Sequence, residues 1–237
     1  MNTRHSRHSC RFRIARAAAA LLLLGAALSG CSSLPDKPVR PVSYDFGPGV
    51  AAASATDAAA PLAPIALADV DTAGVADTAA VTYRLLYTDA QQLRPYAMAR
   101  WALPPGQLVR QRVREVLGQR RPILDADDVL SQKRIEGSLP RILRLQLEEF
   151  SQVFASPGRS EGVVRLRATL VDNTPQGESF VGQRVFVLRR PAASADAPGG
   201  VQALTAATDA AAAEIERWLA SQAPAASVTP VPGARRP

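Results

Sequence analysis

The sequence is poor in the side chains that carry most enzyme chemistry. Its 237 residues include only two histidines, two cysteines and two lysines. Both histidines and both cysteines lie within the first 31 residues, at His5, His8, Cys10 and Cys31. The rest of the chain therefore has no Ser-His or Cys-His pair for nucleophilic catalysis, no His/Cys cluster for a metal and no partner for a disulfide. We expect a protein that is not an enzyme and has no metal or cofactor.

Aromatic residues are also scarce, at 5% of the chain. The net charge of +7 and the isoelectric point near 10.2 would suit a nucleic-acid partner. However, five arginines and no acidic residue fall within residues 1–16. Without residues 1–30, 23 of the 28 cations remain against 21 anions, which leaves a net charge of +2. No basic stripe with interleaved aromatic residues remains, so we expect no nucleic-acid partner.

The arginine-rich start leads into an apolar run of 12 residues, 17–28. A basic segment, a short apolar segment and small residues before a cleavage point are typical of a secretory signal. The alternative is a transmembrane helix, which needs about 20 apolar residues, and this run is too short. The sequence therefore predicts a signal peptide over residues 1–30.

The end of this segment, Leu28-Ser29-Gly30-Cys31, resembles the lipobox of bacterial lipoproteins. In that class the cysteine thiol receives a diacylglyceryl group, and the amine freed by cleavage receives an N-acyl chain. The resemblance implies covalent lipid on Cys31, which becomes the first residue of the mature chain. Because two or three acyl chains hold a protein far more firmly than one, we expect a permanent membrane anchor.

The mature chain divides by composition into three parts. Residues 31–41 contain three prolines and no periodicity, which indicates an extended tether behind the acylated cysteine. Residues 42–221 carry regular hydrophobic patterns and form the expected domain. Residues 222–237 are rich in proline and are expected to be a disordered tail.

Within the domain, alternating or β-branched runs predict strands, and a 3.6-residue period predicts helices. The expected helices cover residues 106–118 and 201–220, and residues 191–200 between strand and helix are expected to be a loop. The expected strands cover residues 42–46, 64–70, 81–87, 141–155, 164–170 and 180–190. The last three strands, joined by short turns, predict an antiparallel meander with one solvated face. The fold class is therefore α/β: a single sandwich of a mixed sheet and two main helices.

Two charged features need an interpretation. Arg165 and Arg167 alternate with apolar residues, which we interpret as the solvated face of a sheet in preference to an anion-binding ladder.

Asp125, Asp127 and Asp128 form the densest carboxylate group. Because they lack the glycine and further acid of a Ca²⁺ loop, we interpret them as a solvated loop or helix N-terminus.

The ordered set of motifs resembles the family of ABC-type transport auxiliary lipoproteins. The resemblance covers nearly all of the domain. It rests on the following segments in order: Cys31, residues 44–48 (YDFGP), 64–67 (PIAL), 83–87 (YRLLY), 96–101 (YAMARW), Pro104-Pro105, 143–150 and a last helix that ends at Trp218-Leu219. The alanine-rich residues 50–63 and the proline-rich tail depart from the family pattern.

The resemblance implies a non-enzymatic subunit of an MCE-type lipid transport system. Its implied partners are a periplasmic MCE protein and, through it, an ABC permease and ATPase. Ser32 after the acylated cysteine implies sorting to the periplasmic face of the outer membrane. A homo-oligomer that matches an MCE ring is a further expectation.

The 96–105 segment is the expected contact with the partner, through Tyr96, Arg100 and Trp101, because these residue types are common at interface hot spots. For Trp101, burial in the core is the favoured alternative. A second function remains open: a periplasmic carrier or chaperone that holds an acyl chain in an apolar cavity.

Overall fold

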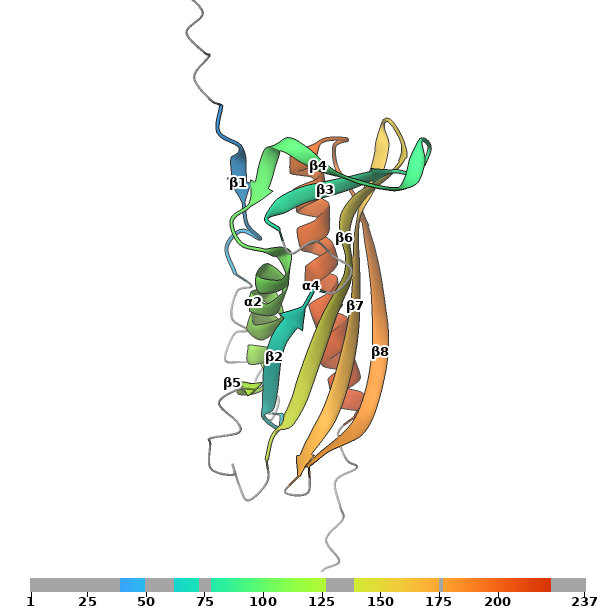
Figure 1. Ribbon diagram of the computed structural model, residues 1–237. Coiled ribbons are helices and arrows are strands. Elements are labelled where there is room, and N and C mark those ends of the chain that lie inside the picture. Colours follow the sequence, from blue (N-terminus) through green and yellow to red (C-terminus); the bar gives the residue numbers. More distant parts are fainter. Residues whose placement is uncertain (1–38, 50–61, 73–77, 127–138, 175–176, 223–237) are drawn as a thin grey trace, which may run out of the picture. The chain divides into compact units, whose positions relative to one another are not determined.

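The strands and helices occur in the order expected from the sequence, with two additional strands. The computed structural model describes residues 39–49, 62–72, 78–126, 139–174 and 177–222 (Figure 1). The predicted signal peptide, Cys31, most of the predicted tether, residues 50–61 and the predicted tail beyond residue 222 lie outside the described residues. The strands and helices all belong to the unit that begins at Pro41.

In the described ranges, eight strands form one mixed sheet. Their bounds are β1 Val42–Tyr44, β2 Ile65–Asp71, β3 Ala80–Leu85, β4 Asp89–Trp101, β5 Ile123–Asp125, β6 Arg141–Ser156, β7 Arg159–Thr174 and β8 Gly177–Pro191. The pairs β3–β4, β6–β7 and β7–β8 are antiparallel, and the pairs β1–β4, β2–β5, β2–β6 and β3–β6 are parallel. The mixed sheet and the antiparallel meander of β6, β7 and β8 are therefore confirmed.

Strand β6 is long enough to pair with two other strands along one edge. Its first part, from Arg141 to Gln146, pairs with β2, and its last part, from Gln152 to Phe154, pairs with β3. The other edge of β6 pairs with β7 over almost its whole length. The sheet consequently forks at β6, and β3, β4 and β1 form a separate branch at the carboxyl end of this strand.

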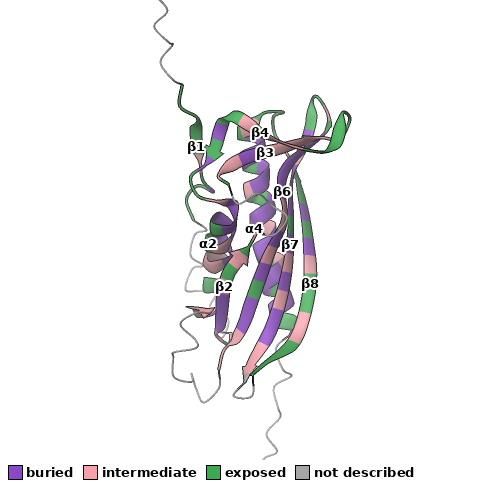
Figure 2. Cartoon of the chain, in the orientation of Figure 1, coloured by how far each residue is buried: buried purple, intermediate pink, exposed green. Residues whose placement is uncertain are grey.

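Two helices, α2 (Pro105–Gly118) and α4 (Ala197–Ser221), cover one face of the sheet and pack against each other. Figure 2 shows buried residues along β6, β7 and both helices. Many buried positions of α4 are alanine, which lets the helix lie close to the sheet: Ala203, Ala207, Ala211 and Ala212. The expected α/β sandwich with two main helices is confirmed.

Helix α4 begins earlier than the sequence predicts. Residues 197–200 were expected to be loop because they contain proline and two glycines, and this prediction is wrong. Asp196 caps the helix by accepting a hydrogen bond from the backbone N–H of Gly199 at 2.9 Å, and a proline stands in the first turn, where its missing N–H is not needed. The Ser194 hydroxyl and the Gly199 N–H lower the pKa of Asp196, which favours its charged, capping form.

The buried polar side chain of Arg112 joins three elements. Its guanidinium donates to the Phe46 carbonyl oxygen at 2.7 Å and to Asp209 of α4 at 2.9 Å. The segment after β1, helix α2 and helix α4 are thereby held together beneath the sheet. Burial raises the pKa of Asp209, although Arg112 acts in the opposite direction.

Candidate functional site

The 96–105 segment begins in β4, a strand that the sequence did not predict. β4 pairs with β3 along one edge, while β1 covers only its last three residues on the other edge. Within the described residues, the outer edge of β4 up to Met98 has no neighbouring strand. The segment then turns at residues 102–104 and enters α2.

Trp101 belongs to the core. Its side chain has no exposed surface, and its ring makes an edge-on contact with Phe46 at 5.6 Å and a tilted contact with Phe150 at 5.5 Å. The favoured alternative for this residue, burial in the core, is therefore confirmed. A buried ring of this size contributes to stability mainly through its apolar area.

Tyr96 is half-buried and fixes β4 to β6. Its hydroxyl donates a hydrogen bond to the Gln152 side-chain oxygen at 2.8 Å, and the Gln152 amide donates to the Ser160 hydroxyl at 2.8 Å. The Tyr96 ring lies 4.6 Å from the ring of Tyr83. Burial, with Tyr83 and Asp196 nearby, raises the pKa of Tyr96 to about 12, so its hydroxyl remains a donor at physiological pH. The contacts assign Tyr96 a positioning role within the fold.

Arg100 is the member of this set whose side chain is free to meet another molecule. It is exposed on β4, and no ion pair or hydrogen bond of its side chain occurs among the described residues. The exposed apolar residues Met98 and Leu103 flank it in sequence. Together, Met98, Arg100 and Leu103 form a surface of mixed character, which we call the Arg100 surface.

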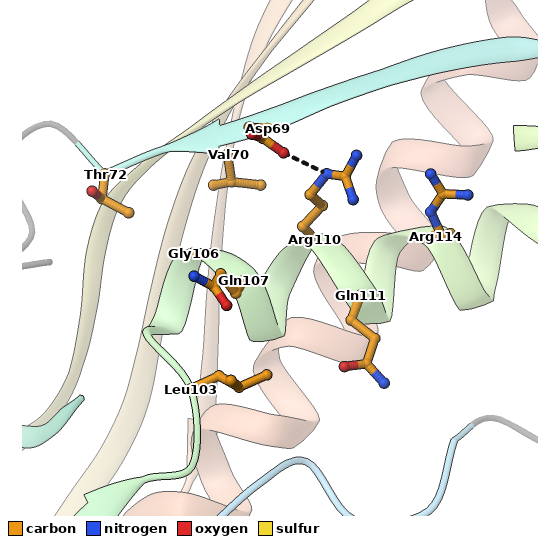
Figure 3. A pocket seen from close by; sticks show the side chains of 9 residues that line it. All are labelled: Asp69, Val70, Thr72, Leu103, Gly106, Gln107, Arg110, Gln111 and Arg114. Carbon is orange, nitrogen blue, oxygen red and sulfur yellow. Dashed lines mark ion pairs between the residues drawn. The ribbon is translucent and has the colours of Figure 1, made fainter. Parts of the chain in front are cut away.

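A groove of about 550 Å³ adjoins this surface at Leu103 and lies between β2 and the first turns of α2 (Figure 3). Its lining is mostly polar: Asp69, Val70, Thr72, Leu103, Gly106, Gln107, Arg110, Gln111 and Arg114. Gly106 permits the close approach of helix and strand, since a Cβ there would lie 2.7 Å from the Thr72 methyl carbon. The polar lining suits a peptide or a headgroup better than an acyl chain.

Two arginines of α2 clamp the helix to the sheet edge at this groove. The Arg110 guanidinium lies 3.0 Å from Asp69 and 2.6 Å from Asp125, and Arg114 also binds Asp125. These hydrogen bonds, the one from Arg110 above all, lower the pKa of Asp125. Asp125 ends β5 and directly precedes Ala126, which is helical, so its position agrees with the sequence interpretation of a helix N-terminus; Asp127 and Asp128 lie outside the described residues.

The sequence did contain a signal for this clamp. Arg110 and Arg114 are four residues apart and therefore lie on one face of a helix. Their acidic partners come from β2 and β5, and no local pattern indicates that these strands lie beside each other.

The arginines of the meander are confirmed as a solvated, ion-paired face. Arg165 and Arg167 of β7 both pair with Glu148 of β6, at 2.5 and 2.6 Å, and lower the pKa of that carboxyl. Arg144 of β6 pairs with Glu178 at 2.7 Å. Each of these guanidinium groups has an acidic partner, so the face is not an anion-binding ladder.

Two other features are absent from the parts of the chain that the structure describes. No group of three or more potential metal ligands occurs among these residues. None of the described helices has the length and apolar character needed to cross a bilayer.

Comparison with known proteins gives a family and a fold. The model of a family described as "ABC-type transport auxiliary lipoprotein component" matches residues 44–216. A crystal structure of a Xanthomonas campestris protein, assigned to the family DUF330, is 17% identical, with a TM-score of 0.54 over 79% of this chain and 90% of that chain. A crystal structure described as an uncharacterized protein is 16% identical, with a TM-score of 0.53 over 76% of this chain and 99% of that chain. Among curated proteins, none matches this sequence.

Proposed function

Because the chain belongs to the family of ABC-type transport auxiliary lipoprotein components, we propose that it serves an MCE-type lipid transport system as a non-enzymatic subunit. In this role it binds the periplasmic MCE protein and, through it, is coupled to the ABC permease and ATPase. The observation that carries the proposal is the family match across residues 44–216, which covers nearly the whole folded domain.

The anchor of this subunit is the lipid on Cys31. The basic and apolar segments before Leu28-Ser29-Gly30-Cys31 support processing at this cysteine. Ser32 supports sorting to the outer membrane, where the domain faces the periplasm. An extended chain of the length of residues 32–41 would reach about 30 Å from the lipid.

The partner contact is the Arg100 surface. Arg100 can bind an acidic group of the partner without first leaving an ion pair with a described residue of its own chain. Met98 and Leu103 add exposed apolar area near it in the sequence. The groove at Leu103 extends this surface with the amide side chains of Gln107 and Gln111. Tyr96 and Trp101 hold β4 in place through contacts inside the domain, and they do not contact the partner themselves.

The test is co-purification of the MCE protein with the full-length lipoprotein and its Arg100→Glu variant. We expect the recovery of the MCE protein to fall several-fold, with no change in melting temperature, because the exposed Arg100 side chain has no hydrogen bond or ion pair with any described residue. Arg217→Glu is the matched control, since this arginine is 75% exposed on α4. Failure of the wild-type chain to recover an MCE protein would contradict the function, and equal recovery by both variants would contradict the Arg100 contact.

A further inference from the structure

The turn between β3 and β4 carries two large apolar residues that its own backbone does not require. The Thr88 N–H closes the turn by donating to the Leu85 carbonyl oxygen at 3.0 Å. Leu86 and Tyr87 lie in the turn, and each is 48% exposed. Turns favour Gly, Asn, Asp, Pro and Ser because of their backbone conformations and local hydrogen bonds. Leucine and tyrosine supply neither, and about half of each side chain is open to solvent.

This turn stands at the end of the sheet where β6 passes into β7. The Leu86 N–H donates to the Phe154 carbonyl oxygen at 3.0 Å, close to the turn at residues 157–158 (Figure 1). Arg159 follows that turn, and Arg190 of β8 pairs across the sheet with Gly162. We call Leu86, Tyr87, Arg159 and Arg190 the hairpin tip.

The cations of the hairpin tip differ from those of the ion-paired sheet face. Arg159 is exposed, and its side chain has no hydrogen bond or ion pair among the described residues. Within the described part of the chain, the Arg190 side chain donates only to the carbonyl oxygen of its neighbour Arg189, at 2.9 Å. The acids nearby are already engaged: Glu161 pairs with Arg189, and Asp89 accepts from the Gln91 N–H at 3.0 Å. The hairpin tip thus combines exposed apolar groups with guanidinium groups that have no acidic partner in the ranges that the structure describes.

The chain between Cys31 and β1 is long enough for the hairpin tip to reach the membrane that holds the anchor. β1 pairs with the far end of β4, in the register Val42 to Ala99, and Val42 comes eleven residues after Cys31 in the sequence. Eleven extended residues reach about 35 Å, and the ten residue steps of β4 from Asp89 to Ala99 span about 33 Å. A chain that is anchored at Cys31 can therefore bring the hairpin tip to the bilayer surface without unfolding β1.

We propose that the hairpin tip is a second membrane contact, in which Leu86 and Tyr87 enter the headgroup layer and Arg159 and Arg190 face lipid phosphates. The inference rests on the proposed lipid anchor at Cys31. Tyrosine favours the interface because its ring is apolar and its hydroxyl is polar, and arginine beside an anionic surface adds electrostatic attraction. The contact orients the domain on the membrane, which a lipid anchor at one end of the chain does not do alone.

The test uses the full acylated chain in vesicles of phosphatidylethanolamine and phosphatidylglycerol that contain spin-labelled lipid. An environment-sensitive fluorophore is attached at Thr88→Cys in the exposed turn, so that Leu86 and Tyr87 stay intact. The new thiol is the only free one, since Cys10 leaves with the signal peptide and Cys31 carries the lipid. Ser179→Cys is the matched control, an exposed hydroxyl residue paired with Asp172 near the opposite end of the sheet.

We expect the label at Thr88→Cys to be quenched several-fold more than the label at Ser179→Cys. Adding Leu86→Ser and Tyr87→Ser is expected to reduce this quenching to the level of the control. Equal quenching at both positions in chains that float with the vesicles would overturn the inference and leave the anchor intact. Chains that do not float would overturn the anchor itself. Shielding of the Thr88→Cys label only after the MCE protein is added would show a protein contact and also overturn the inference.

Discussion

The α-carbon of Gly162 in β7 lies directly against the backbone of Leu204 in α4. A Cβ on Gly162 would stand 2.5 Å from the Leu204 nitrogen and 2.6 Å from the Ala203 carbonyl carbon. Backbone atoms of a packed helix cannot move aside as a flexible side chain can. This contact therefore sets the distance between the sheet and the long helix near the end that carries the hairpin tip.

Replacing Gly162 by alanine is expected to destabilise the domain by about 2–3 kcal/mol, since the added methyl group forces helix and strand apart. Gly158→Ala is the matched control, because a Cβ at that turn position meets nothing within 4 Å. Denaturant unfolding of both variants measures the difference. Equal stabilities would show that α4 does not lie as close to β7 as described.

The buried pair of Arg121 and Glu216 gives a second prediction. Their side chains are 5% and 9% exposed and meet at 2.8 Å, which ties the segment after α2 to the last turns of α4. Arg121→Ala is expected to lower the free energy of unfolding by about 3–5 kcal/mol, because it leaves a buried carboxylate without its counter-ion.

The solvated ion pairs should behave differently. Arg144→Ala removes a partner of Glu178 from a pair that is 51% and 40% exposed, and the expected cost is below about 1 kcal/mol. Chemical denaturation compares the two arginine variants directly. A cost at Arg144 as large as that at Arg121 would contradict the assignment of the meander face as solvated.

Asp125 gives a prediction for pH dependence. Arg110 and Arg114 lower its pKa in the folded state, so its contribution to stability is fully present above the ordinary value of about 3.9 and is lost as pH falls through the lowered pKa. Asp125→Asn is expected to be less stable than the wild type at neutral pH, by at most about 1 kcal/mol for a carboxyl this exposed. The difference should shrink below about pH 4. Thermal unfolding across this range tests it, and a difference that grows on acidification would contradict the clamp.

Much of the fold could be predicted from the sequence because its strands and helices have clear periods. Alternation at Val164, Leu166 and Leu170 marked β7, and the 3.6-residue spacing from Leu204 to Trp218 marked α4. Strand β4 was missed because Pro95 and a run of polar residues break the pattern. An edge strand tolerates such a residue, since its outer side forms no ladder hydrogen bonds there.

The candidate sites were less predictable because they depend on distant segments. Nothing local to β6 indicates that it pairs first with β2 and then with β3, which is what brings Gln152 to Tyr96. Residue type alone suggested Tyr96, Arg100 and Trp101 as one contact surface. Their burial differs, however: Tyr96 is half-buried, Arg100 is exposed and Trp101 lies in the core.

The central claim is that this domain is carried by a lipid on Cys31. Its most direct test is mass spectrometry of the native chain purified from membranes, together with metabolic labelling by palmitate and a Cys31→Ser control. The account predicts a mature chain that begins at an acylated Cys31 and a label that disappears in the Cys31→Ser variant. A native chain that begins at Met1, or one that carries no acyl group, would contradict it.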